Sequence, residues 1–230
     1  MNLFQGLYLG EVVLLVLGVI LFLALIVLLL RGKKGLIGYF VVCVVCIGYP
    51  SIKSFQYGEF SVTLADQTAA LQKDPADPQA RQAVEKTLAQ IESRPAPNAQ
   101  ASALIARAQF AVGNEAAAQV NLEKALMADP KAPAALALKE KIGAIQQLDQ
   151  LTAAVKSNPE NAAAKAELTT KIEQATKEPI ANQEALAKVA QAQAAIGKSQ
   201  EAATTAEKVF KINPNAASAI ALKKLMVVPK

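Results

Sequence analysis

The chain has 230 residues, a formal net charge of +5, no histidine and two cysteines. The lack of histidine removes the commonest general base and the commonest transition-metal ligand, and both cysteines, Cys43 and Cys46, lie within an apolar run. We therefore expect no enzymatic activity, no metal site and no cofactor. Basic and acidic residues are interspersed after Pro50, which does not favour nucleic-acid binding.

Residues 1–50 are predicted to form a two-helix membrane anchor. Residues 10–30 are almost entirely apolar, and about 20 such residues span the hydrocarbon core of a bilayer as a helix. A second apolar run, 36–52, is shorter and is interrupted by glycine and proline. It is expected to be a second transmembrane helix, with a re-entrant segment as the alternative.

The short link between the two apolar runs sets the expected topology. It contains Arg31, Lys33 and Lys34, and such basic turns stay on the cytoplasmic side of a membrane. Both ends of the chain then lie outside the cytoplasm. We expect a multi-pass protein of the cell inner membrane with its C-terminal region in the periplasm.

Residues 51–64 form a connector with a different pattern. Phe60, Val62 and Leu64 alternate with polar residues, as in a β-strand. A short β-hairpin and an irregular segment at the membrane surface both agree with this pattern, and the sequence leaves the two open.

From Ala65 onward the chain is predicted to be helical throughout. Alanine dominates, together with leucine, lysine, glutamate and glutamine, which are good helix formers. Prolines at regular intervals end the helices. The expected helices cover residues 65–73, 77–93, 98–112, 115–128, 132–157, 161–177, 181–196, 199–211 and 216–226.

The sequence repeats with a period of 84 residues in two tandem units, here taken as residues 65–147 and 148–230. Three prolines in the first unit recur 84 positions later: Pro75, Pro95 and Pro130 match Pro159, Pro179 and Pro214. Tandem helical units stack through their apolar faces into a solenoid. The predicted fold class is therefore all-α, a transmembrane hairpin followed by an α-solenoid of two units.

The helix expected over residues 132–157 joins the two units. Its apolar residues recur at intervals of three and four, which places them on one face. We expect this stripe to be a core shared by the units, with an external coiled-coil seam as the alternative. The residues are Leu138, Ile142, Ile145, Leu148, Leu151 and Val155.

The segment 101–130 resembles a tetratricopeptide repeat (TPR), a pair of helices joined by a tight turn. The resemblance is carried by the pair Ile105-Ala106, the turn Gly113-Asn114, and then Ala118, Leu122, Ala125 and Pro130. The second unit matches with Val189-Ala190, Gly197-Lys198, Ala202, Ala206, Val209 and Pro214. Gln109 and Gln193 depart from the family, because they stand at a position that is usually aromatic.

This resemblance implies a concave groove that binds a protein partner and is lined by the first helix of each repeat. Arg107 is the expected partner for a carboxylate, beside an aromatic ring at Phe110. Ordinary solvated surface residues are the alternative interpretation. The expected partner-binding residues are Gln100, Arg107, Phe110 and Asn114 in the first unit, and Glu184, Lys188 and Gln191 in the second.

The expected function is that of a membrane-anchored TPR scaffold for the assembly of an envelope complex. Its architecture is similar to that of the bacterial cytochrome c assembly factors, which carry a TPR domain outside the cytoplasm. The alternative is a structural accessory subunit of a larger membrane complex or of a homo-oligomeric ring. The expected partners are the lipid bilayer and one or more proteins.

Overall fold

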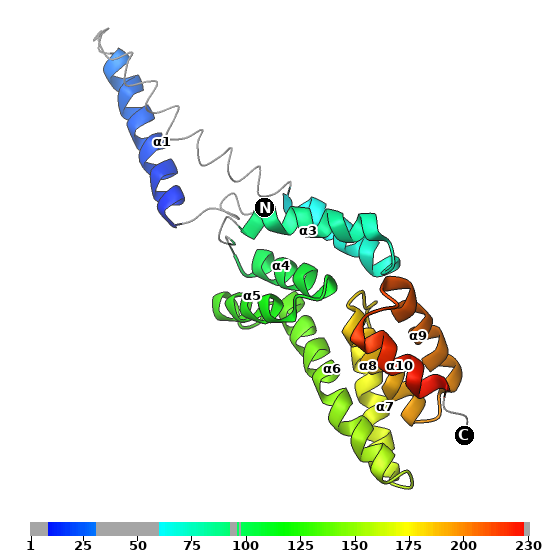
Figure 1. The fold of residues 1–230 in the computed structure, drawn as a ribbon. Coiled ribbons are helices and arrows are strands. Elements are labelled where there is room, and N and C mark those ends of the chain that lie inside the picture. The colour runs from blue at the N-terminus through cyan, green and yellow to red at the C-terminus, as the bar shows by residue number, and fades with distance from the viewer. Residues whose placement is uncertain (1–8, 31–59, 93–95, 97, 228–230) are drawn as a thin grey trace.

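The computed structural model describes residues 9–30, 60–92, 96 and 98–227, and every regular element within them is a helix (Figure 1). The all-α prediction is thus confirmed for this part of the chain. The helices are α1 (Leu9–Leu30), a helix over residues 60–73, α3 (Pro78–Glu92), α4 (Ala99–Ala111), α5 (Glu115–Ala128), α6 (Pro133–Ser157), α7 (Ala162–Thr176), α8 (Gln183–Ala195), α9 (Ser199–Ile212) and α10 (Ala217–Val227).

Helix α1 is 22 residues long and contains one charged residue, Glu11. Several of its large apolar side chains are exposed, among them Val13, Leu17 and Ile20. Among the residues that the structure describes, no helix is both long enough and apolar enough to cross a membrane. The second apolar run of the expected anchor lies outside the described residues.

Residues 60–64, for which the sequence left a β-hairpin and an irregular segment open, are neither, because they begin the helix over residues 60–73. Leu64 and Leu71 are seven residues apart, so they lie on one face of that helix, and both are fully buried. They pack in one apolar cluster with Val84 of α3 and Ile105 of α4. Tertiary burial thus overrides the local alternation. The remainder of the connector, 51–59, lies outside the described residues.

The helices recur with the same period as the sequence. Helices α7, α8 and α9 begin and end 84 residues after α3, α4 and α5. Helix α6 corresponds to two helices at once: its residues 133–143 match α10, and its residues 144–157 match the helix over residues 60–73. One continuous helix therefore belongs to both units.

Equivalent side chains and turns delimit the equivalent helices. Asn98 caps α4 by accepting a hydrogen bond from the Ala101 amide at 2.8 Å, and Asn182 caps α8 through the Ala185 amide at 3.1 Å. Gly113 and Gly197 follow α4 and α8 with φ angles of 91° and 83°. This left-handed conformation ends a helix and favours glycine, which has no Cβ.

Small residues allow the two helices of each pair to pack closely. Helix α4 packs against α5, and α8 packs against α9. Ala118 of α5 is 0% exposed and Ala202 of α9 is 4% exposed, as expected for alanines at a helix contact.

Helix α6 runs from beside α5 along α8 and α7 (Figure 1). It packs against α4 and α5 of the first unit and against α7 and α8 of the second. Its apolar stripe is buried, except that Leu151 is half-buried, and it belongs to a cluster with residues of both units. The expected shared core is confirmed.

Candidate functional site

Arg107, the leading candidate for partner binding, is engaged within the chain. Its Nη2 atom donates a hydrogen bond to Gln72 Oε1 at 2.9 Å and lies 3.4 Å from Glu178 Oε2. The side chains of Arg107 and Glu178 are 42% and 47% exposed, so water screens this ion pair and its stabilisation is modest. Arg107 thus pairs with the carboxylate of Glu178, in the second unit, and not with that of a bound partner as expected.

Phe110 does not line a free groove, contrary to the expectation from the sequence. Its side chain is 4% exposed and belongs to the core cluster shared by the units. The physical reason is that α4 packs against three helices, α3, α5 and α6, so that few of its positions remain accessible.

The other expected residues of the first unit lie at the surface. Gln100 and Asn114 are exposed. The side chain of Asn114 accepts a hydrogen bond from the Ala117 amide at 3.2 Å, which caps α5. Asn114 therefore has a structural role that the sequence did not indicate.

The expected residues of the second unit lie along α8. Glu184 is exposed, whereas Lys188 and Gln191 are half-buried. Lys188 Nζ lies 2.9 Å from Asp149 Oδ2 of α6, and this hydrogen bond raises the pKa of Lys188. The expected site residues are thus divided between α4 and its turn in one unit and α8 in the other.

A buried lysine that was not among the expected site residues lies where the units meet. Lys141 of α6 is 6% exposed, and its Nζ donates hydrogen bonds to the carbonyl oxygens of Glu178 at 3.0 Å and Pro179 at 2.8 Å. Burial lowers the pKa of Lys141 to about 8, the negative charge of Glu178 opposes this shift, and the positive charge of Arg107 adds to it. Helical spacing could have revealed Lys141, since it follows Leu138 by three residues on the apolar stripe.

A second missed residue, Arg81 of α3, contacts both units. Its Nη1 donates to the Val112 carbonyl oxygen at 3.0 Å, and its Nη2 donates to the Ala181 carbonyl oxygen at 3.4 Å. Burial lowers the pKa of Arg81, and the nearby Glu85 opposes the shift. We call Arg81, Arg107 and Lys141 the junction cations, because all three contact residues 178–181 of the second unit.

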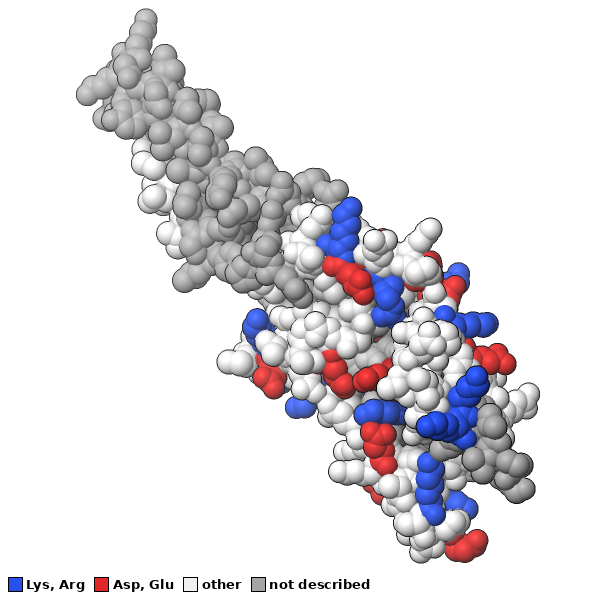
Figure 2. All heavy atoms as spheres, in the orientation of Figure 1, with Lys and Arg blue, Asp and Glu red and all other residues white. Residues whose placement is uncertain are grey.

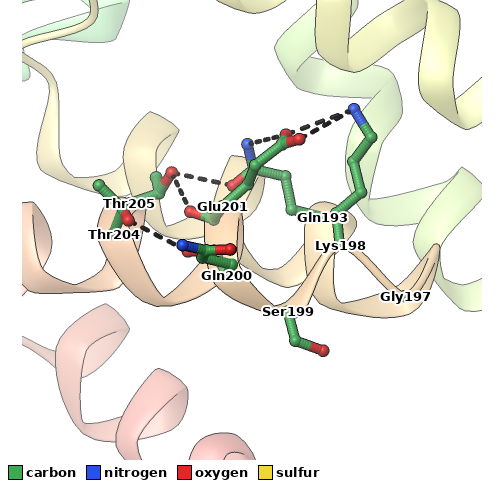
Figure 3. Close-up of a pocket in the computed structure, with 8 residues that line it drawn as sticks. All are labelled: Gln193, Gly197, Lys198, Ser199, Gln200, Glu201, Thr204 and Thr205. Atoms are coloured by element: carbon green, nitrogen blue, oxygen red, sulfur yellow. Dashed lines mark hydrogen bonds and ion pairs between the residues drawn. The ribbon is translucent and has the colours of Figure 1, made fainter.

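A separate polar depression of about 640 Å³ lies beside the turn between α8 and α9 (Figure 3). Gln193, Lys198, Glu201 and Thr205 converge there, and Lys198 Nζ lies 3.3 Å from Glu201 Oε1. None of the expected partner-binding residues lines it. The lining residues are Gln193, Gly197, Lys198, Ser199, Gln200, Glu201, Thr204 and Thr205.

Charge is mixed on the face of the molecule shown in Figure 2, where basic and acidic side chains alternate. Over the described ranges, no group of three or more histidine, cysteine, aspartate or glutamate side chains is placed to hold a metal ion. Comparison with protein-family models, with curated proteins and with solved structures found no match.

Proposed function

We propose that this protein is a membrane-anchored helical scaffold that holds another protein through its two repeated units. The observation that carries the proposal is the repetition of a helical pair, α4–α5 and α8–α9, around the shared helix α6. Stacked helical pairs provide an extended surface, which is the usual basis of protein binding in repeat proteins. In this proposal the units are of the TPR type.

The proposed partner surface consists of the accessible residues of α4 and α8. Of the residues expected from the sequence, it includes Gln100 on α4 and Glu184, Lys188 and Gln191 on α8. Phe110 is not part of it, because it is buried, and the guanidinium of Arg107 is shared with Glu178.

Helix α1 supports the anchor part of the proposal through its exposed apolar surface. At about 1.5 Å per residue its 22 residues extend roughly 33 Å, which matches the hydrocarbon core of a bilayer. Val13, Leu17 and Ile20 are 58%, 53% and 57% exposed, and such surface is unfavourable in water.

The partner surface can be tested by site-specific photocrosslinking in intact cells. A photoreactive amino acid at Gln100 or Gln191 should capture a partner, whereas the same amino acid at the exposed Lys131 on the α5–α6 turn should not. Mass spectrometry then identifies the product. Equal capture at all three positions contradicts the proposed surface, and products that contain only this chain favour a homo-oligomeric structural subunit.

The topology can be tested separately in a bacterial host. A reporter enzyme that is active only in the periplasm should be active when it is fused after Lys230. Activity of a cytoplasmic reporter at the same position, with no periplasmic activity, would show that the repeated units face the cytoplasm.

A further inference from the structure

Gly143 lies within α6, the helix that belongs to both units. By the repeat, residues 133–143 of α6 correspond to α10, and residues 144–157 correspond to the helix over residues 60–73. A change in its backbone would therefore change the angle between the units.

No packing requirement explains a glycine at this position. A Cβ atom on Gly143 would meet no atom within 4 Å, and the residue has an ordinary helical conformation. Glycine in the interior of a helix is unfavourable relative to alanine, because it loses more backbone freedom on folding. Gly143 is thus a point of reduced stiffness in an otherwise regular 25-residue helix.

Helix α6 is the main connection between the units. Of the described helices α3, α4 and α5, none packs directly against α7, α8, α9 or α10, whereas α6 packs against helices of both sets. A second link between the units is the short segment 178–181, which precedes α8 and contacts residues of α3, α4 and α6.

The junction cations hold this segment with four polar contacts. Lys141 binds the carbonyl oxygens of Glu178 and Pro179, Arg81 binds that of Ala181, and Arg107 pairs with the Glu178 carboxylate. The side chain of Ala181 adds an apolar contact, since it is buried in the cluster that contains Ile105 and Ala108. All these contacts join the first unit to the second.

The three cations are not part of the repeat itself. At the equivalent positions, the second unit has Lys165 for Arg81, Gln191 for Arg107 and Leu225 for Lys141. The first unit therefore carries a set of residues that is specific to this junction.

We propose that the two units form a hinged clamp in which α6 bends at Gly143 and the junction cations act as a latch on residues 178–181. With the latch closed, the angle between the units is fixed. Release of the segment frees the units to rotate about α6, in the manner of hinge motions at a few backbone positions. The outer contact, Arg107 with Glu178, is the one that solvent reaches, so it is the part of the latch that opens first.

The test measures the distance between the units in the full chain by pulsed electron spin resonance. Spin labels are attached through Glu123→Cys in α5 and Glu207→Cys in α9, two exposed positions that are equivalent in the repeat, with Cys43→Ser and Cys46→Ser. The parent should give one narrow distance distribution. The latch variant Arg107→Gln/Glu178→Gln, and separately Lys141→Met, should give a broader distribution with a longer mean distance.

The hinge is tested in the background of the latch variant. Gly143→Ala should narrow the distribution again, whereas Gln147→Ala, at an exposed position of the same helix, should not. Circular dichroism measures whether each variant is folded. If Lys141→Met does not fold, the variant Arg107→Gln/Glu178→Gln still tests the latch, because both of its residues are partly exposed. An unchanged distribution in the folded latch variants, or equal narrowing by both α6 substitutions, would overturn the proposal.

Discussion

Gln109 and Gln193 lie 84 residues apart, and their side-chain oxygens accept hydrogen bonds from residues that are also 84 apart. Asn121 Nδ2 donates to Gln109 Oε1 at 2.9 Å, and Thr205 Oγ1 donates to Gln193 Oε1 at 2.9 Å. The two units therefore keep one polar contact between the helices of each pair, with different donors. Both glutamines are themselves buried, so each unit satisfies a buried side-chain oxygen between its paired helices.

Gln109→Met should lower the free energy of unfolding by about 1 kcal/mol, because the hydrogen bond is lost while the buried volume is nearly kept. Asn121 is only half-buried, so water can satisfy its amide, which limits the cost. Urea unfolding of the purified chain measures the change. In a double-mutant cycle with Asn121→Ala the two effects should not add, and additive effects would show that the contact carries no energy.

Ala202→Leu should destabilise the second unit by about 1–3 kcal/mol, because a larger side chain cannot fit where α8 and α9 meet. Ala118→Leu should do the same in the first unit, since Ala118 is fully buried. The matched control is Ala116→Leu, at an exposed position of α5 two residues before Ala118. Thermal unfolding followed by circular dichroism should show a lower midpoint for the first two variants and almost no change for the control.

Phe110→Ala should destabilise the chain by about 3–5 kcal/mol, the usual cost of removing a buried phenylalanine side chain. Arg107→Ala should cost no more than about 1 kcal/mol, since its ion pair is half-exposed. Both are measured by urea unfolding. A small change in the free energy of unfolding for Phe110→Ala would mean that the ring is accessible. Phe110 would then belong to the proposed partner surface.

Thr68 and Thr152 are equivalent in the repeat, but their hydroxyl groups differ. Thr68 Oγ1 donates to the Leu64 carbonyl oxygen at 2.7 Å, whereas the buried Thr152 Oγ1 has no hydrogen-bond partner among the residues that the structure describes. Thr152→Val should therefore leave the stability unchanged or increase it, and Thr68→Val should decrease it by about 1 kcal/mol. Equal melting temperatures for the two variants would contradict this difference.

The stability of the chain should depend on Lys141 in alkaline solution. Its folded pKa of about 8 lies below the ordinary value of 10.5, so between these values the unfolded chain binds a proton that the folded chain has released. The free energy of unfolding contributed by this residue should then rise with pH across that window, and it should be constant below it. The measurement compares the pH dependence of urea unfolding for the parent and Lys141→Met. Parallel curves would show that the pKa of Lys141 is not lowered.

The sequence by itself determined the helices and their repetition. Proline and asparagine at the ends of segments fixed most helix boundaries to within a residue or two, because these residues act on the backbone next to them. The stripe on α6 was readable for a similar reason, since helical spacing alone places Leu138, Ile142 and Ile145 on one face. The alternation of apolar and polar residues around Phe60 did not reveal the helix, because it spans too few residues to distinguish a strand from the first turn of a helix.

Only the tertiary structure decided which faces remain free and how the units meet. The burial of Phe110 follows from three helices that surround α4, and nothing in the sequence around Phe110 encodes their positions. Arg81 binds the carbonyl of Ala181, a residue 100 positions away, and that contact depends on the path of every helix between them. Local patterns report local backbone preferences, whereas a contact between distant residues is set by the packing of the whole chain, and the candidate site depends on such contacts.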